Sequence, residues 1–149
     1  MGLDMYLFRN IYIGAQYEHR EVKGTVDIEI RGKNVPINLN ELSEIVLIGI
    51  QWRKAHVIHK WFVDNVQGGE DDCNPYPVTK EHLIQLHNLC NQVLNDNSLA
   101  ESLLPSQSGF FFGSTEYDQG YYQDLQDTIR IIDDILEYKS YCLDDLHYC

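Results

Sequence analysis

Alternating apolar and polar residues near the N-terminus predict a β-strand. In residues 3–13, Met5 and Leu7 lie on one side of the alternation, and Asp4 and Tyr6 lie on the other. Successive side chains of a strand point to opposite faces of a sheet. The segment is therefore expected to form an N-terminal strand with two chemically different faces.

A second alternating pattern predicts a β-hairpin over residues 25–39. Val26, Ile28 and Ile30 recur at every second position and are expected to point inward. A Gly-Lys-Asn turn follows, and the alternation then resumes. Because Pro36 has no backbone N–H to donate, the second arm is expected to lie at an edge or outside regular pairing.

Two short runs predict further strands. Residues 44–51 are rich in β-branched side chains and are expected to form a buried strand. Residues 109–112, a glycine followed by three phenylalanines, predict another short strand. Together with the N-terminal strand and the hairpin, these runs give a small sheet of about four or five strands.

A helical period in the apolar residues predicts about three helices, at residues 53–66, 80–95 and 118–138. Thr79 precedes the second helix and is well suited to be its N-cap. Strands and helices are interspersed without strict β-α-β alternation, which favours an α+β fold. We expect a small antiparallel sheet packed against the three helices.

The chain length of 149 residues is typical of one domain. We expect this single α+β domain to span residues 1–140. Residues 141–149 are expected to form a short acidic C-terminal tail that is loosely ordered.

Charge is distributed unevenly along the chain, whose net charge is −12. Residues 1–60 carry eight basic and seven acidic side chains, whereas residues 101–149 carry two basic and ten acidic ones. This balance argues against non-specific nucleic-acid binding, which depends on cationic side chains. The acidic last third is a candidate surface for contact with a protein.

The apolar runs are too short for a membrane helix. The longest, residues 45–50, falls far below the roughly 20 residues that a span requires. The N-terminus lacks the cationic and apolar regions of an export signal. We therefore expect a cytoplasmic protein with reduced cysteines and no membrane contact.

Two pairs of ligand-type residues have the spacing of one helical turn. His56 and His59 form one pair, and His87 and Cys90 form the other, so four zinc ligands are conceivable if the two helices faced each other. However, His87 falls within an apolar stripe, where a hydrogen-bonded core histidine is the simpler explanation. We therefore expect no metal and no cofactor.

The main candidate site is a basic and aromatic cluster at residues 52–61, within an acidic chain. Its indoles and imidazoles are suited to stacking on a base or ribose, and its cations are suited to binding phosphate. The alternative is an ordinary helix with solvated cations and locally bonded histidines. The candidate binding residues in the cluster are Trp52, Arg53, Lys54, His56, His59 and Trp61.

A second candidate segment, residues 109–118, joins a predicted strand to a helix. Ser114, Thr115 and free backbone amides at the next helix are suited to holding an oxyanion. The segment is not a P-loop, because it lacks the GxxxxGK(S/T) pattern and no lysine follows Gly113. In the alternative interpretation, Thr115 or Asp118 only caps the helix.

Three sequence segments resemble a known family. They are MGLDMYL at residues 1–7, WRKAHVIHKWFVDN at residues 52–65 and SGFFFGSTEYD at residues 108–118. Together they are similar to small phage and prophage proteins that begin with MGLDMYL. The resemblance implies a viral or prophage accessory protein in a bacterial cytoplasm, and it implies no activity or catalytic residue.

Our first functional hypothesis is a non-enzymatic binder that captures a small anionic, nucleotide-like molecule in one pocket, with opposition to host defence as its candidate role. One alternative is an acidic inhibitor that binds a host protein through residues 101–149. Another is a phosphodiesterase that uses His56 or His59. A homo-oligomer, in which a second copy of the chain completes the pocket, is a further alternative. The candidate ligand-binding residues are Asp4, Tyr6, Trp52, Arg53, Lys54, His56, His59, Trp61, Ser114, Thr115 and Tyr117.

Overall fold

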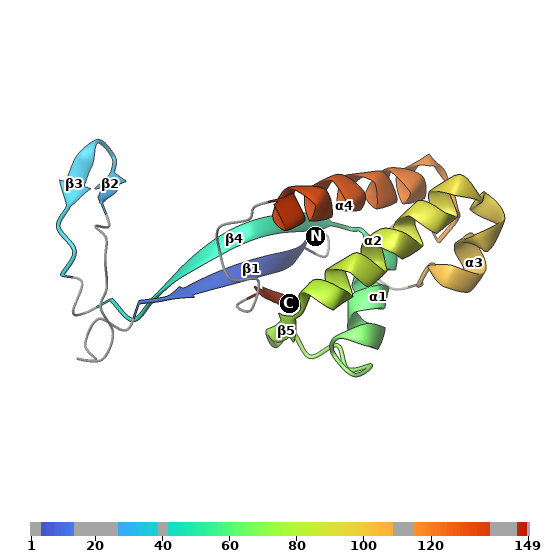
Figure 1. Ribbon diagram of the computed structural model, residues 1–149, viewed down its shortest axis with the longest axis horizontal. Coiled ribbons are helices and arrows are strands. Elements are labelled where there is room, and N and C mark those ends of the chain that lie inside the picture. The colour runs from blue at the N-terminus through green and yellow to red at the C-terminus, as the bar shows by residue number, and fades with distance from the viewer. Residues whose placement is uncertain (1–3, 14–26, 39–41, 109–114, 138–145, 149) are drawn as a thin grey trace.

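A computed structural model of the chain describes residues 4–13, 27–38, 42–108, 115–137 and 146–148 (Figure 1). The strands are β1 (Asp4–Tyr12), β2 (Ile28–Ile30), β3 (Lys33–Val35), β4 (Glu44–Arg53), β5 (Tyr76–Val78) and β6 (Leu146–Tyr148). The helices are α1 (His56–Asn65), α2 (Lys80–Asn95), α3 (Ala100–Leu103) and α4 (Gln119–Glu137), with a short 3₁₀ helix η2 (Asn97–Leu99). The fold is α+β, as the sequence predicts, and the strand predicted at 109–112 lies outside the described residues.

The main sheet is antiparallel and has the strand order β4-β1-β6-β5. Met5 pairs with Trp52 and Leu7 pairs with Ile50, and all four side chains are buried. On the other face of β1, Asp4 is exposed. The alternation predicted for the N-terminal strand is therefore confirmed.

A β-bulge interrupts the pairing of β1 with β4. Leu7 pairs with Ile50 and Phe8 pairs with Ile48, so Gly49 is the extra residue. Since a bulge shifts the alternation by one position, Ile50 and Leu47 lie on the same face although they are three residues apart. The strand predicted at residues 44–51 is confirmed, but its predicted burial is wrong at Val46 and Leu47, which lie beyond the core and are exposed.

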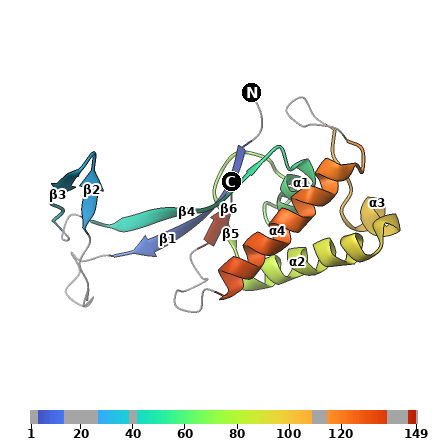
Figure 2. The same cartoon turned by 90° about the horizontal axis from the view of Figure 1, so that it is seen from above.

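The helices cover one face of the main sheet (Figure 2). Trp52 of β4 reaches into this layer, where its ring contacts Phe62 of α1 and Tyr148 of β6. Thr79 caps α2 as predicted, because its hydroxyl accepts a hydrogen bond from the backbone N–H of His82. None of the described helices is long and apolar enough to cross a membrane.

The part of the structure that extends away from the helices forms an arm, which we define as residues 8–13, 27–38 and 42–48. In the arm, β1 and β4 run away from the helices as a ribbon, and the β2–β3 hairpin lies at its far end (Figures 1 and 2). The hairpin is predicted correctly, but the inward orientation of Ile28 and Ile30 is wrong, since both are exposed. The helical layer ends before it reaches them, and Val26 lies outside the described residues.

The C-terminal strand β6 lies between β1 and β5 in the main sheet. Leu146 and Tyr148 are buried in the core. The prediction of a loosely ordered tail is therefore wrong for residues 146–148. Three residues are too short a stretch for alternation to be recognised, and their pairing partners are distant in sequence.

Candidate functional site

The two indoles of the predicted site belong to the core. Trp52 is buried, and its Nε1 donates a hydrogen bond to the Thr128 hydroxyl of α4 over 3.0 Å. Trp61 is also buried and meets Phe62 edge to face. Neither ring is available as a stacking platform at the surface.

His59 is held between two partners inside the fold. Its Nδ1 lies 2.9 Å from the Tyr148 hydroxyl, and its Nε2 lies 3.0 Å from a carboxylate oxygen of Asp71. A carboxylate only accepts, so Nε2 donates to Asp71, and in the neutral ring Nδ1 then accepts a hydrogen bond from the tyrosine hydroxyl. The side chain is buried and connects α1 to β6 and to the loop before β5.

His56 begins α1 and is also buried. Burial lowers the pKa of His56, while its bond to the Lys54 backbone and the negative charge of Asp118 act in the opposite direction. Lys54 precedes it with a positive φ of 60° and is exposed. The burial of both histidines disfavours their use as a general acid or base on a substrate.

Three predicted site residues lie together on the sheet face opposite the helices. Arg53 approaches Asp4 with 3.9 Å between Nε and Oδ1. Gln51 donates to Asp4 over 3.5 Å and to the Tyr6 hydroxyl over 3.3 Å. Tyr6 stacks on Phe8 with ring centroids 5.7 Å apart. These residues form what we call the outer-face group: Asp4, Tyr6, Gln51 and Arg53.

The second predicted segment is separate from the outer-face group in its contacts. The Thr115 carbonyl accepts a hydrogen bond from the Ser106 hydroxyl over 2.7 Å. The Tyr117 hydroxyl accepts one from the Ser106 backbone over 3.3 Å. Ser114 lies outside the described residues. The contacts of Thr115 and Tyr117 thus anchor this segment to the chain that follows α3.

Sequence reasoning missed a small pocket between α1 and the end of α3. Its volume is about 60 Å³, well below the range of roughly 300–1,000 Å³ that is usual for small-molecule sites. The pocket and the contacts of His59 lie on different sides of α1. It is lined by Val57, Lys60, Trp61, Asp64, Asn65, Leu103, Leu104 and Pro105.

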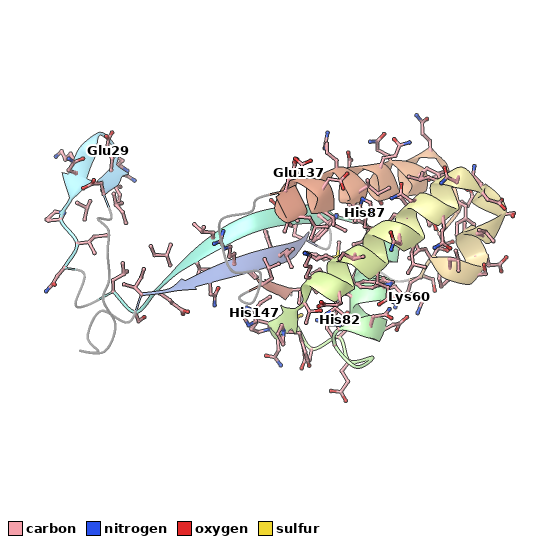
Figure 3. The ribbon with its side chains drawn as sticks, viewed as in Figure 1. Glu29, Lys60, His82, His87, Glu137 and His147 are labelled. Atoms are coloured by element: carbon pink, nitrogen blue, oxygen red, sulfur yellow. The ribbon has the colours of Figure 1, made fainter. Side chains whose placement is uncertain are left out.

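The outer side of α4 carries negative charge that a single arginine only partly compensates. Burial, followed by the charges of Asp127 and Asp118, raises the pKa of Asp124 to about 6. Arg130 is the one basic side chain of this helix, and it binds Asp127 over 3.1 Å. Asp134 and Glu137 are exposed further along the helix, and Figure 3 shows Glu137 at its C-terminal end.

The two predicted ligand pairs for zinc have other roles. His87 binds Asp133 of α4 over 2.8 Å and so joins α2 to α4 (Figure 3). Cys90 is a buried free thiol, and burial raises its pKa to about 12. Among the residues that the structure describes, no group of three His, Cys, Asp or Glu side chains is placed to hold a metal ion.

Comparisons of the chain with family models, curated proteins and solved structures find no match. The resemblance to phage and prophage proteins therefore stays a prediction from the three sequence segments.

Proposed function

We propose that the protein is a non-enzymatic binding protein and that the outer side of α4 contacts a basic surface of a partner protein. The observation that carries the proposal is the charge of this helix, where one arginine stands against five carboxylates. We call three of these carboxylates the α4 acidic face: Asp127, Asp134 and Glu137.

The charges around Asp124 support an interaction with a cationic surface. Burial is the main cause of the raised pKa of Asp124, and the negative charges of Asp127 and Asp118 add to it, so the local field is negative and only partly compensated within the chain. A lysine- or arginine-rich surface would relieve this repulsion and would be drawn to the helix over a Debye length of roughly 8 Å at physiological salt. An anionic partner would be repelled.

The surroundings of the histidines favour binding over catalysis. His59 has both ring nitrogens engaged, by Tyr148 and Asp71. His56 is buried at the start of α1, and its pKa is lowered chiefly by burial. A phosphodiesterase would need at least one of these imidazoles to meet the substrate.

The resemblance to phage and prophage proteins supplies a setting for the proposal. In that setting the partner is a bacterial host protein with a basic contact surface. The protein would act in the bacterial cytoplasm by occupying that surface.

The test is affinity capture from a bacterial lysate with the immobilised protein. One variant neutralises the α4 acidic face by D127N, D134N and E137Q. A control variant carries E70Q, E81Q and E101Q, which remove three exposed carboxylates elsewhere and give the same net charge. We expect the wild type and the control to retain the same protein, and the α4 variant to lose it.

Three results would contradict the proposal. They are retention of no specific protein by the wild type, equal retention by all three forms, and equal loss from both variants. The last result would mean that only net charge matters. Circular dichroism of each variant confirms that the fold is intact.

A second candidate function is capture of a small anionic ligand by the outer-face group. The observation that favours it is the series of contacts that joins Arg53 to Asp4, Asp4 to Gln51 and Gln51 to Tyr6, with Tyr6 stacked on Phe8. A thermal-shift screen with cyclic and linear nucleotides tests it. Stabilisation of the wild type that R53E abolishes supports capture, and an equal response of both forms, or none, excludes it.

A further inference from the structure

Exposed apolar surface is concentrated on the arm. Among the described residues, six large apolar side chains are more than a third exposed. One of them, Ile84, lies on α2 and is 39% exposed. The five on the arm are Ile28 (38%), Ile30 (55%), Val35 (38%), Val46 (52%) and Leu47 (43%).

The hairpin at the end of the arm has an apolar face that the described residues leave uncovered. Ile28 pairs with Val35, and Ile30 pairs with Lys33, so the three apolar side chains share one face. Within the described part of the chain, β2 and β3 pair only with each other. An isolated two-stranded sheet is marginally stable in water, so this face is expected to pack against another surface.

The charge balance of the arm indicates what that surface is. The arm carries three basic side chains and three acidic ones, so it has no net charge. The other described residues carry five basic and fifteen acidic side chains, a net charge of −10. Two copies of the chain therefore repel each other through their helical parts and not through their arms, where apolar surface is also exposed.

Strand β4 offers a complementary edge for the same contact. It lies at the edge of the main sheet, and among the described residues it pairs only with β1. Long apolar edge strands readily pair with another strand. Seven of the ten residues of β4 are apolar or glycine, between Glu44 at one end and Gln51 and Arg53 towards the other.

The β4 strands of two copies can pair antiparallel, and the charged residues at the two ends of β4 are then complementary. A two-fold axis between Ile48 and Gly49 places Glu44 of one copy opposite Arg53 of the other, and the same contact recurs at the second end. The bulge at Gly49 puts both charged side chains on the same sheet face, that of Asp4 and Tyr6. Opposite charges directly across two strands stabilise their pairing.

We propose that a second copy of this chain covers the arm, in a two-fold dimer whose β4 edges pair antiparallel. The two helical parts then lie at opposite ends of the paired strands, which limits their repulsion. The dimer is independent of the α4 acidic face, so either proposal can fail without the other.

Sedimentation velocity at about 1–100 µM protein tests the dimer. We expect the wild type to sediment as a dimer and L47K to be monomeric, with a dissociation constant raised by about 100-fold or more because two lysines enter the interface. I84K is the matched control, since Ile84 is similarly exposed but lies on α2. A monomeric wild type, or an L47K variant that stays dimeric, would overturn the proposal.

Charge exchange tests the register of β4. E44R alone and R53E alone should each weaken the dimer, because each leaves like charges opposite one another. The double variant restores opposite charges and should restore the dimer. A double variant no tighter than either single variant would overturn the antiparallel pairing. Unchanged circular dichroism shows that each variant is folded.

Discussion

Tyr148 is the residue whose replacement best separates an ordered C-terminal strand from a loose tail. It is 0% exposed. Its ring stacks on Phe62 with centroids 3.9 Å apart and an interplanar angle of 8°. Its hydroxyl lies 2.9 Å from Nδ1 of His59. Replacing it by phenylalanine removes the hydroxyl alone, whereas alanine also removes the ring.

The expected losses follow from these contacts. Y148F leaves Nδ1 of the buried His59 without its tyrosine donor, which costs about 1–3 kcal/mol. Y148A also leaves a cavity against Phe62, and removal of a buried aromatic ring costs about 3–5 kcal/mol. Since small domains are stable by about 5–15 kcal/mol, Y148A should remove a large share of the free energy of unfolding. Each kcal/mol corresponds to a fall in Tm of about 2–4 °C.

Urea denaturation followed by tryptophan fluorescence measures these losses, because the Trp52 ring lies 6.2 Å from that of Tyr148. H147A is the control. His147 is the adjacent residue, points to the opposite face of β6 and is half-buried, so its loss should cost less than about 1 kcal/mol. A Y148A variant as stable as the wild type would refute the role assigned to β6.

Three further stability effects are expected. The pKa of Asp124 rises from its usual 3.8 to about 6, so the folded state loses stability as the pH rises from about 4 to 6 and keeps the full loss above pH 6. D124N should therefore be more stable than the wild type by about 1 kcal/mol at pH 7 after allowance for solvent screening. Urea titrations should show this difference closing between pH 6 and 4, and a difference independent of pH would contradict the assignment. T128A should cost about 1–3 kcal/mol, because it leaves the buried Nε1 of Trp52 without an acceptor, while T128S should restore most of the loss in the same assay. T79A removes the cap of α2 and should lower Tm by an amount equivalent to about 0.5–2 kcal/mol in calorimetry, with T79S close to the wild type.

The three longer helices could be predicted from the sequence because their signals are local, whereas the four-residue helix α3 and the 3₁₀ helix η2 are not predicted. The second helix has both a regular apolar stripe and a capping threonine, and its observed bounds are those predicted. The first helix begins at His56 rather than at residue 53, because β4 continues through Arg53 in its pairing with Asp4. That pairing joins residues 49 positions apart, and local periodicity carries no information about it.

The candidate site could be predicted only in part, for the same reason. The helical pattern places His59 at the border of the core but does not reveal Tyr148 as its partner, 89 residues away. The indoles of Trp52 and Trp61 are equally compatible with stacking on a ligand and with the core that they occupy. The alternation at residues 25–39 predicts a hairpin, yet no local signal shows that the helices end before its apolar face.

The most direct test of the central claim is the affinity of the purified partner for three forms of the protein. Calorimetric titrations would compare the wild type, the D127N/D134N/E137Q variant and the charge-matched control at 50 and 300 mM salt. We predict that the control binds like the wild type, that the α4 variant binds at least about tenfold more weakly, and that salt weakens wild-type binding. Equal affinity of all three forms at both salt concentrations would contradict a function carried by the outer side of α4.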